Sequence, residues 1–143
     1  MSIPNLKQVE SSVWSAGQPA ADDWSSLPAA GIRAVVNLRG AEEQPGFDEA
    51  TAVREHGLDY HEFPVRSPAD FSSERVAAFA ELVAQLRPGG VLVHCGSGNR
   101  VGAMFALARG REPGVTVDAA LDYGRRAGLL GSEPQIAMLL RSY

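Results

Sequence analysis

The segment VLVHCGSGNRVGAMFALA, residues 91–108, decides how this chain folds. Its first four residues form a short apolar run, which is typical of a strand at the centre of a parallel sheet. Cys95, the only cysteine in the chain, comes next and opens the glycine-rich turn of residues 96–99. Residues 100–109 predict a helix that is apolar on nearly all sides and therefore buried. The one thiol is thus expected at the carboxyl end of a core strand, just before a buried helix.

Strands and helices alternate along the rest of the chain. Further strands are predicted over residues 32–38 and within LDYHEFPV, residues 58–65. Helices are predicted over residues 22–31, 48–56, 116–126 and 133–142, and also after Ser72, where apolar residues recur at helical spacing. This order predicts one α/β domain, residues 1–143, with a central, mostly parallel sheet of about four to five strands flanked by helices.

The composition is that of an ordinary globular protein. Hydrophobic residues make up 45% and charged residues 21%, which argues against disorder. The net charge is −4, the arginines are scattered and Lys7 is the only lysine, so neither nucleic acid nor a membrane is an expected partner. One cysteine can form neither an internal disulfide nor a zinc cluster. No apolar run approaches the ~18 residues of a membrane span. MSIPNLKQVE has no apolar signal region, so we expect a cytoplasmic enzyme without metal or cofactor.

Three loops are expected to meet at one edge of the sheet, because the carboxyl ends of parallel strands lie together and form the usual ligand-binding edge. The first carries Arg39, the second carries Arg66, and the third is residues 95–100. Two arginines would therefore lie near the thiol. Arg39 and Arg66 are either solvated loop residues or additional groups that bind an anionic substrate.

The glycine-rich turn suits a sulfur nucleophile. A helix N-terminus and a nearby cation both stabilise a thiolate, and the sequence predicts both beside Cys95. Gly96 and Gly98 allow successive backbone N–H groups to turn inward and form an anion-binding nest. Arg100 provides a planar fork that can hold two oxygens of a tetrahedral anion. These features predict a site that binds an oxyanion directly over the sulfur.

Two other interpretations of this turn are possible from the residues alone. A lone cysteine at the end of an apolar strand is often a small core residue, but the glycine turn, the helix and Arg100 together favour the nucleophile. A glycine-rich turn between a strand and a helix can also be a nucleotide phosphate loop. Neither G-x-G-x-x-G after a strand nor G-x-x-x-x-G-K-[ST] is present, so this second interpretation is set aside.

HCGSGNRVG, residues 94–102, resembles the active-site loop of the protein tyrosine phosphatase superfamily. VWSAGQP (13–19), VVNLRGAEEQPGFDEA (35–50) and YHEFPV (60–65) resemble the phosphatase-like domain of the beta-lactamase-hydrolase-like family. The resemblance implies a dual-specificity-phosphatase-like fold, with Cys95 as nucleophile and Arg100 as anion clamp. The anion-binding loop that it implies consists of Gly96, Ser97, Gly98 and Asn99, with Val101 after the arginine.

The spacing of this loop departs from the phosphatase pattern. Four residues separate Cys95 from Arg100, whereas mainstream tyrosine phosphatases have C-x5-R. The shorter spacing resembles the loop of single-domain rhodaneses, which carries a persulfide. Val101 also stands where phosphatases of this type have Ser or Thr to assist the leaving thiolate, and Ser97 is the candidate substitute.

The position at which phosphatases of this type place a general acid also differs in this chain. Arg66 stands where related sequences suggest the acid that protonates the leaving oxygen, and Asp70 is the candidate in its place. Such an acid typically contributes about 10²–10⁴-fold in rate, but it would not matter for sulfur transfer between thiols. His94 is expected to orient the cysteine loop rather than to act as a general base.

Three functions are consistent with these residues. The leading hypothesis is a cysteine-thiolate phosphohydrolase that forms a thiophosphoryl intermediate on Cys95 and acts on a small anionic or phosphorylated substrate. The alternative is a rhodanese-like sulfurtransferase, in which Cys95 carries a persulfide from a sulfur donor to an acceptor thiol. The third is an oxyanion-binding module without turnover.

Overall fold

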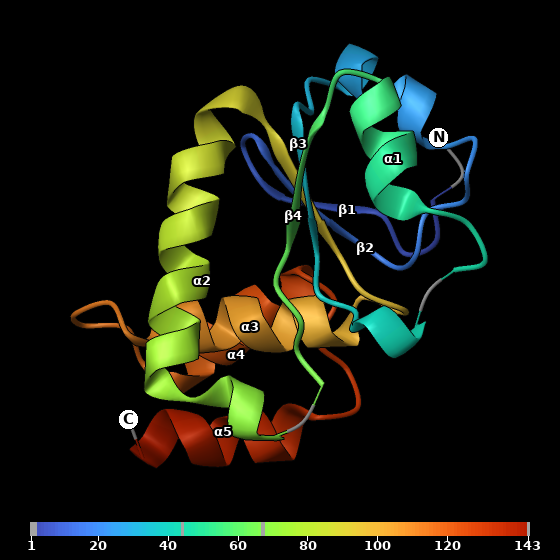
Figure 1. Ribbon diagram of the computed structural model, residues 1–143. Coiled ribbons are helices and arrows are strands. Elements are labelled where there is room, and N and C mark those ends of the chain that lie inside the picture. Colours follow the sequence, from blue (N-terminus) through green and yellow to red (C-terminus); the bar gives the residue numbers. More distant parts are fainter. Residues whose placement is uncertain (1–2, 44, 67, 143) are drawn as a thin grey trace.

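The computed structural model describes residues 3–43, 45–66 and 68–142, and a five-stranded sheet lies at its centre (Figure 1). The strands are β1 (Lys7–Glu10), β2 (Val13–Ala16), β3 (Ala34–Asn37), β4 (Asp59–Glu62) and β5 (Val91–His94). Their order across the sheet is β1-β2-β5-β3-β4. Only the pair β1–β2 is antiparallel; β2, β5, β3 and β4 all run parallel. The predicted α/β fold with a mostly parallel sheet is confirmed.

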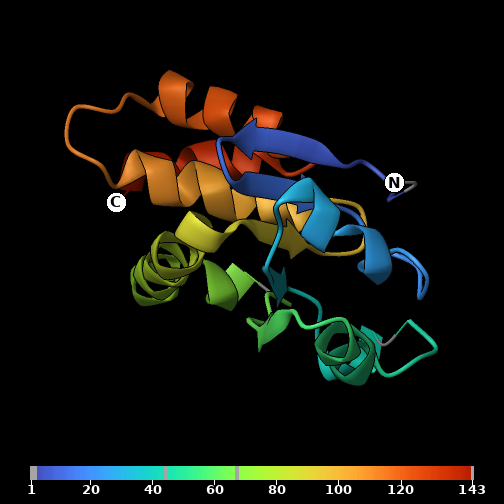
Figure 2. The same cartoon turned by 90° about the horizontal axis from the view of Figure 1, so that it is seen from above.

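Helices cover both faces of the sheet (Figure 2). One face packs against α2 (Ser73–Leu86), α3 (Asn99–Gly110), α4 (Val117–Arg126) and α5 (Glu133–Ser142), and the other against α1 (Glu49–Glu55). Side chains alternate along β5, so that Val91 and Val93 join the first core and Leu92 joins the second. β5 is therefore buried on both faces, as its apolar run predicts.

The segment between β2 and β3 differs from the predicted helix over residues 22–31. It forms two short 3-10 turns, Trp24–Ser26 and Pro28–Ala30. Pro28 has no N–H to continue an α-helical hydrogen-bond ladder, which explains the break. Gly31 ends the segment with a φ of +84°, the left-handed conformation that glycine adopts readily. The predicted strand over 32–38 is shorter in the structure, where β3 comprises Ala34–Asn37.

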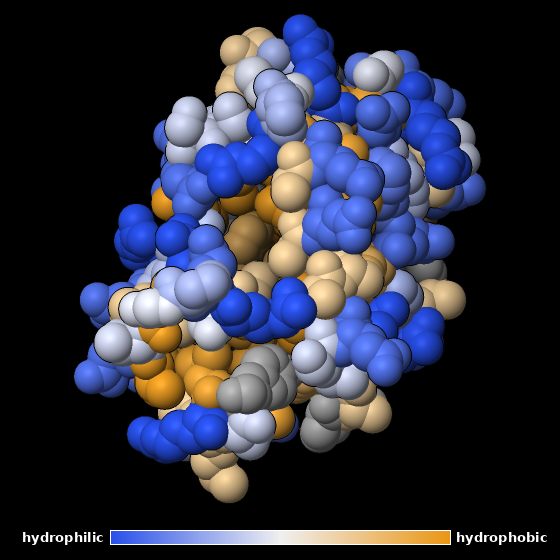
Figure 3. Space-filling view, turned by 90° about the vertical axis from the view of Figure 1, so that its left-hand side faces the viewer, coloured by the Kyte–Doolittle hydropathy of each residue, from blue (hydrophilic) through white to orange (hydrophobic). Residues whose placement is uncertain are grey.

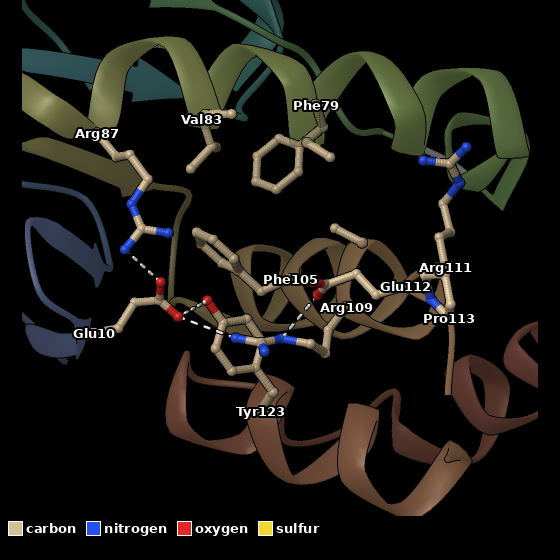
Figure 4. Close-up of a pocket in the computed structure, with 13 residues that line it drawn as sticks. Glu10, Phe79, Val83, Arg87, Phe105, Arg109, Arg111, Glu112, Pro113 and Tyr123 are labelled. Carbon is tan, nitrogen blue, oxygen red and sulfur yellow. Dashed lines mark hydrogen bonds and ion pairs between the residues drawn. The ribbon is translucent and has the colours of Figure 1, made fainter. Parts of the chain in front are cut away.

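The sequence does not predict the β1–β2 hairpin, because its turn lacks the Asn-Gly or Asp-Gly signal of tight hairpins. Ser12 supplies the required positive φ of 67° instead. Glu10, at the end of β1 just before this turn, anchors the hairpin to the helical layer (Figure 4). Its carboxylate accepts hydrogen bonds from the Tyr123 hydroxyl at 2.8 Å and from Arg109 Nη2 at 3.0 Å, and it pairs with Arg87 at 2.5 Å.

A hollow of about 510 Å³ opens beside this cluster, between α2 and α3, and none of the residues 95–100 lines it. Figure 3 shows hydrophobic side chains inside a hollow on this face, with hydrophilic side chains around it. The apolar lining includes Phe79, Val83 and Phe105. In the described part of the chain, no helix is long and apolar enough to cross a bilayer.

Helix α3 approaches α4 and the segment after it so closely that side chains are excluded from the contact. A Cβ on Gly102 would lie 2.0 Å from the backbone nitrogen of Leu129 and 2.7 Å from the carbonyl oxygen of Gly124. A Cβ on Gly124 would lie 2.6 Å from the Cβ of Ala106. The glycines thus fix the depth at which α3, and the loop that precedes it, sit in the core.

We expect Gly102→Ala to lower the free energy of unfolding by about 1–3 kcal/mol, because the added methyl must displace backbone atoms. The matched control is Gly131→Ala, since a Cβ at Gly131 meets nothing within 4 Å. Urea unfolding of both variants checks the difference. A Gly102→Ala protein as stable as Gly131→Ala would contradict the close packing described above.

Candidate active site

The Cys95 loop leaves the carboxyl end of β5 and enters α3 after only residues 95–98. Cys95 is fully buried, and its backbone N–H donates to the Ala16 carbonyl at the end of β2. Gly98 has a φ of +99°, which turns its own N–H back toward the sulfur at 3.1 Å from Sγ. The loop therefore aims a backbone donor and the N-terminus of α3 at the sulfur.

Arg100, in the first turn of α3, carries a bidentate ion pair with Glu43. Arg100 Nη1 donates to Glu43 Oε2 at 2.9 Å, and Nη2 donates to Oε1 at 2.7 Å. Nη1 also donates to the Val65 carbonyl after β4. A Cβ on Gly96 would lie 3.6 Å from Arg100 Nη2, so the guanidinium lies over the cysteine loop. Hydrogen bonding to Glu43, and attraction to the Cys95 sulfur, raise the pKa of Arg100.

Glu43 lies in the 3-10 turn Ala41–Glu43, in the loop after β3. The hydrogen bond from Arg100 lowers the pKa of this carboxyl to about 2, against the opposing effect of partial burial. The Gly40 N–H donates to the same carboxylate at 3.0 Å, and Arg39 Nε lies 3.7 Å from it. Glu43 therefore stays ionised at neutral pH and holds the guanidinium of Arg100 at a fixed position.

His94 lies beneath the cysteine and is joined to a buried carboxyl group. Its Nε2 is 2.5 Å from Glu49 Oε2, and its Nδ1 is 3.2 Å from the Cys95 carbonyl oxygen. Both His94 and Glu49 are almost completely buried. The other Glu49 oxygen accepts from Gln18 Nε2 at 2.8 Å, and Gln18 Oε1 accepts from Arg39 Nη1 at 2.7 Å. A chain of polar contacts thus runs under the loop from His94 to Arg39.

The outer side of the loop is held by two asparagines. Asn5 Nδ2 donates to the Ser97 carbonyl at 2.8 Å. Asn99 Nδ2 donates to Ser132 Oγ at 3.2 Å, and Asn99 Oδ1 accepts from the Leu130 N–H at 2.7 Å. These contacts tie the loop to the N-terminal segment and to the connection between α4 and α5.

Three further predicted site residues, Val101, Arg66 and Asp70, lie outside the Cys95 loop itself. The Val101 side chain is fully buried in the core. Arg66 is half exposed and pairs with Glu42 at 3.2 Å. The Arg66 backbone N–H donates to Asp70 Oδ2 at 2.8 Å, so this carboxylate closes the turn after β4. Among the described residues, no group of three or more His, Cys, Asp or Glu side chains gathers to hold a metal.

A family model described as "DSP-PTPase phosphatase fused to NAD+ Kinase" matches residues 3–128. The chain belongs to this phosphatase family. The resemblance predicted from HCGSGNRVG and the flanking motifs is confirmed.

Two curated relatives of this chain are named beta-lactamase hydrolase-like proteins. The one from Agrobacterium fabrum is 30% identical over 117 residues, which cover 79% of this chain and 27% of that protein. The one from Xylella fastidiosa strain Temecula1 is 38% identical over 96 residues, which cover 64% of this chain and 22% of that protein. The chain thus spans about a quarter of the length of these relatives.

Solved structures share the fold of this chain. A DUF442 protein from Shewanella putrefaciens CN-32 has a TM-score of 0.74 at 26% identity, over 98% of this chain and 88% of that one. TpbA from P. aeruginosa has a TM-score of 0.74 at 21% identity, over 99% and 86%. A TpbA variant in complex with pTyr has a TM-score of 0.66 at 18% identity, over 97% and 91%. The dual-specificity-phosphatase-like architecture is confirmed.

Sequence reasoning missed three residues that contact the site from other parts of the chain, Glu43, Glu49 and Gln18. Glu43 stands 57 positions before its partner Arg100, and Glu49 stands 45 before His94. One signal was available for Glu43, since it follows β3 in the same loop as Arg39 and so reaches the same sheet edge. Glu49 looks like an ordinary charged residue in the first turn of α1.

We expect Glu43→Gln to lower the free energy of unfolding at neutral pH by about 1–2 kcal/mol, because it breaks a charge-assisted pair. The pKa of Glu43 lies below its ordinary value of 4.5, so the stabilisation is complete above about pH 4.5 and declines as the pH falls towards 2. Urea unfolding over a pH series should show the difference from the wild type narrowing below pH 4.5. The control is Glu42→Gln, whose exposed pair should contribute little at any pH. A wild-type advantage unchanged by acid would contradict this assignment.

We expect Glu49→Ala to destabilise the protein by about 3–5 kcal/mol, because the fully buried His94 would lose its carboxylate partner. Glu55→Ala, in the same helix but exposed, is the matched control and should change stability by less than about 0.5 kcal/mol. Thermal unfolding of both variants measures the effect. Equal unfolding temperatures for the two would refute the role of the buried pair.

Proposed function

We propose that this protein is a phosphohydrolase that works through a covalent phosphoryl intermediate on Cys95. One observation carries the proposal: the Gly98 N–H points at the Cys95 sulfur from a turn that opens a helix, while Arg100 lies over the same turn. A tetrahedral anion held by the loop N–H groups and the guanidinium would then lie beside the sulfur. Membership of a phosphatase family supports the same chemistry.

In the proposed first step, the Cys95 thiolate attacks phosphorus, an S–P bond forms, and the bond from phosphorus to the leaving oxygen breaks. Arg100 and the loop N–H groups hold the equatorial oxygens, where negative charge accumulates. Water then attacks phosphorus, the S–P bond breaks, and phosphate and the thiolate are released. TpbA, a neighbour with the same fold, is seen in complex with pTyr, which supports a phosphorylated substrate for this chain.

Glu43 would serve this reaction by positioning Arg100. An unrestrained arginine side chain loses about 2 kcal/mol of rotamer entropy when it is fixed on a ligand. The bidentate pair already fixes both terminal nitrogens before substrate arrives. Preorganised charge of this kind does not need to be reorganised during the reaction.

Sulfur transfer is the second candidate, and the spacing of the loop favours it. Four residues between Cys95 and Arg100 resemble the persulfide-carrying loop of rhodaneses. A persulfide on Cys95 would be attacked by an acceptor thiolate, which takes the outer sulfur and returns the Cys95 thiolate. No general acid is required for that exchange.

The test compares two assays on the same protein. We expect hydrolysis of an aryl phosphate that is abolished in Cys95→Ser and reduced about 10²–10³-fold in kcat/KM in Arg100→Lys. The exposed Arg111, remote from the loop, provides the control, and Arg111→Lys should keep the wild-type rate.

The second assay supplies thiosulfate and cyanide. Thiocyanate formation without phosphate release would refute the phosphatase and establish the sulfurtransferase. Inactivity in both assays, with phosphate still bound at the loop, would leave only an oxyanion-binding module.

A further inference from the structure

A small pocket of about 190 Å³ adjoins Arg100. Its described lining comprises Val65, Arg66, Phe71, Asn99, Arg100, Ala103, Ser132 and Gln135. This pocket shares Arg100 with the anion site, so the group attached to a bound phosphate would extend into it. The character of this lining therefore bears on which leaving groups the site can expel.

No carboxyl or imidazole group belongs to the described lining of this pocket. The residue at the rim after β4 is Arg66, which cannot release a proton at neutral pH. The polar groups that do line it, on Asn99, Ser132 and Gln135, are amides and a hydroxyl. They can donate hydrogen bonds to an anion, but they cannot supply a proton at neutral pH.

Three carboxyl groups contact the arginines that line the pocket, and each accepts a hydrogen bond or forms an ion pair there. Glu43 is ionised and holds Arg100 through both oxygens. Asp70 accepts from the Arg66 backbone N–H and closes its own turn. Glu42 pairs with the Arg66 side chain at the surface. These contacts use the carboxyl groups as acceptors, which is the opposite of what a general acid requires.

From this arrangement we infer, given the proposed function, that the site selects phosphate carried on an acidic leaving group, such as an acyl phosphate or a phosphoanhydride. The leaving group departs as an anion, without a proton from the protein. The Cys95 thiolate forms the S–P bond, the P–O bond breaks, and its electron pair stays on the departing oxygen. Arg66 and the Ser132 hydroxyl lie where they can stabilise that anion. Alkyl phosphates, whose leaving groups are strongly basic, are then poor substrates.

The test is the dependence of kcat/KM on leaving-group acidity, measured with the wild-type chain on dinitrophenyl, nitrophenyl and phenyl phosphate and on acetyl phosphate. This ratio reports the steps up to formation of the S–P bond, so slow hydrolysis of the intermediate does not mask it. We expect kcat/KM to fall about 10²–10⁴-fold from dinitrophenyl to phenyl phosphate, the range that a general acid would otherwise supply. Acetyl phosphate should be cleaved well and an alkyl phosphate hardly at all.

The Asp70→Asn variant tests whether Asp70 acts as a general acid or only holds the turn after β4. The amide keeps an oxygen that can accept from the Arg66 N–H, so we expect all esters to change by the same factor and the slope to stay as in the wild type. A flat wild-type profile would overturn the inference, and so would an Asp70→Asn protein that loses activity selectively on phenyl phosphate. Either result would leave the phosphatase standing. If even dinitrophenyl phosphate gives no Cys95-dependent turnover, the proposed function itself fails.

Discussion

The step from β5 into α3 constrains everything else in this structure. Only residues 95–98 connect the central strand to a helix that is buried along most of its length. Gly98 makes this connection possible, because its φ of +99° turns its own N–H onto the Cys95 sulfur and starts α3 at the next residue. Gly128 crowds the same place, since a Cβ there would lie 2.7 Å from the Gly98 carbonyl oxygen. The sulfur is thus fixed by the core rather than by a flexible loop.

Polar contacts around the sulfur also hold the Cys95 loop and Arg100 in place. His94 and Glu49 hold the loop from below, and Glu43 holds Arg100 from the side. Arg39 links the two, because it donates to Gln18 and lies beside Glu43. Loops that follow β2, β3 and β5 are therefore joined around one thiol. Groups held in this way keep their geometry without a ligand, which is the condition for preorganised catalysis.

The sequence predicted the elements that its own local chemistry determines. The apolar run of residues 91–94, the glycines after Cys95 and the periodicity of residues 100–109 gave β5, the turn and α3 in their correct places. The hairpin was missed because Ser12 rather than glycine takes the positive φ, and Pro28 divided a predicted helix into two turns. The contacts of Glu43 and Glu49 join residues far apart in the chain, so no local pattern could reveal them. Tertiary packing determines which charged side chains form ion pairs, and a single sequence does not reveal that packing.

The pairing of charges at the mouth of the site has a kinetic consequence. Three arginines, Arg39, Arg66 and Arg100, and three carboxylates, Glu42, Glu43 and Asp70, belong to the loops around the site, so their formal charges cancel. The chain as a whole carries −4. A doubly charged anion approaching from beyond a Debye length, about 8 Å at physiological ionic strength, therefore meets no attractive field. Capture depends on collisions that reach the loop N–H groups directly. Added salt would screen a repulsion rather than an attraction, which is the reverse of what an electrostatically steered enzyme shows.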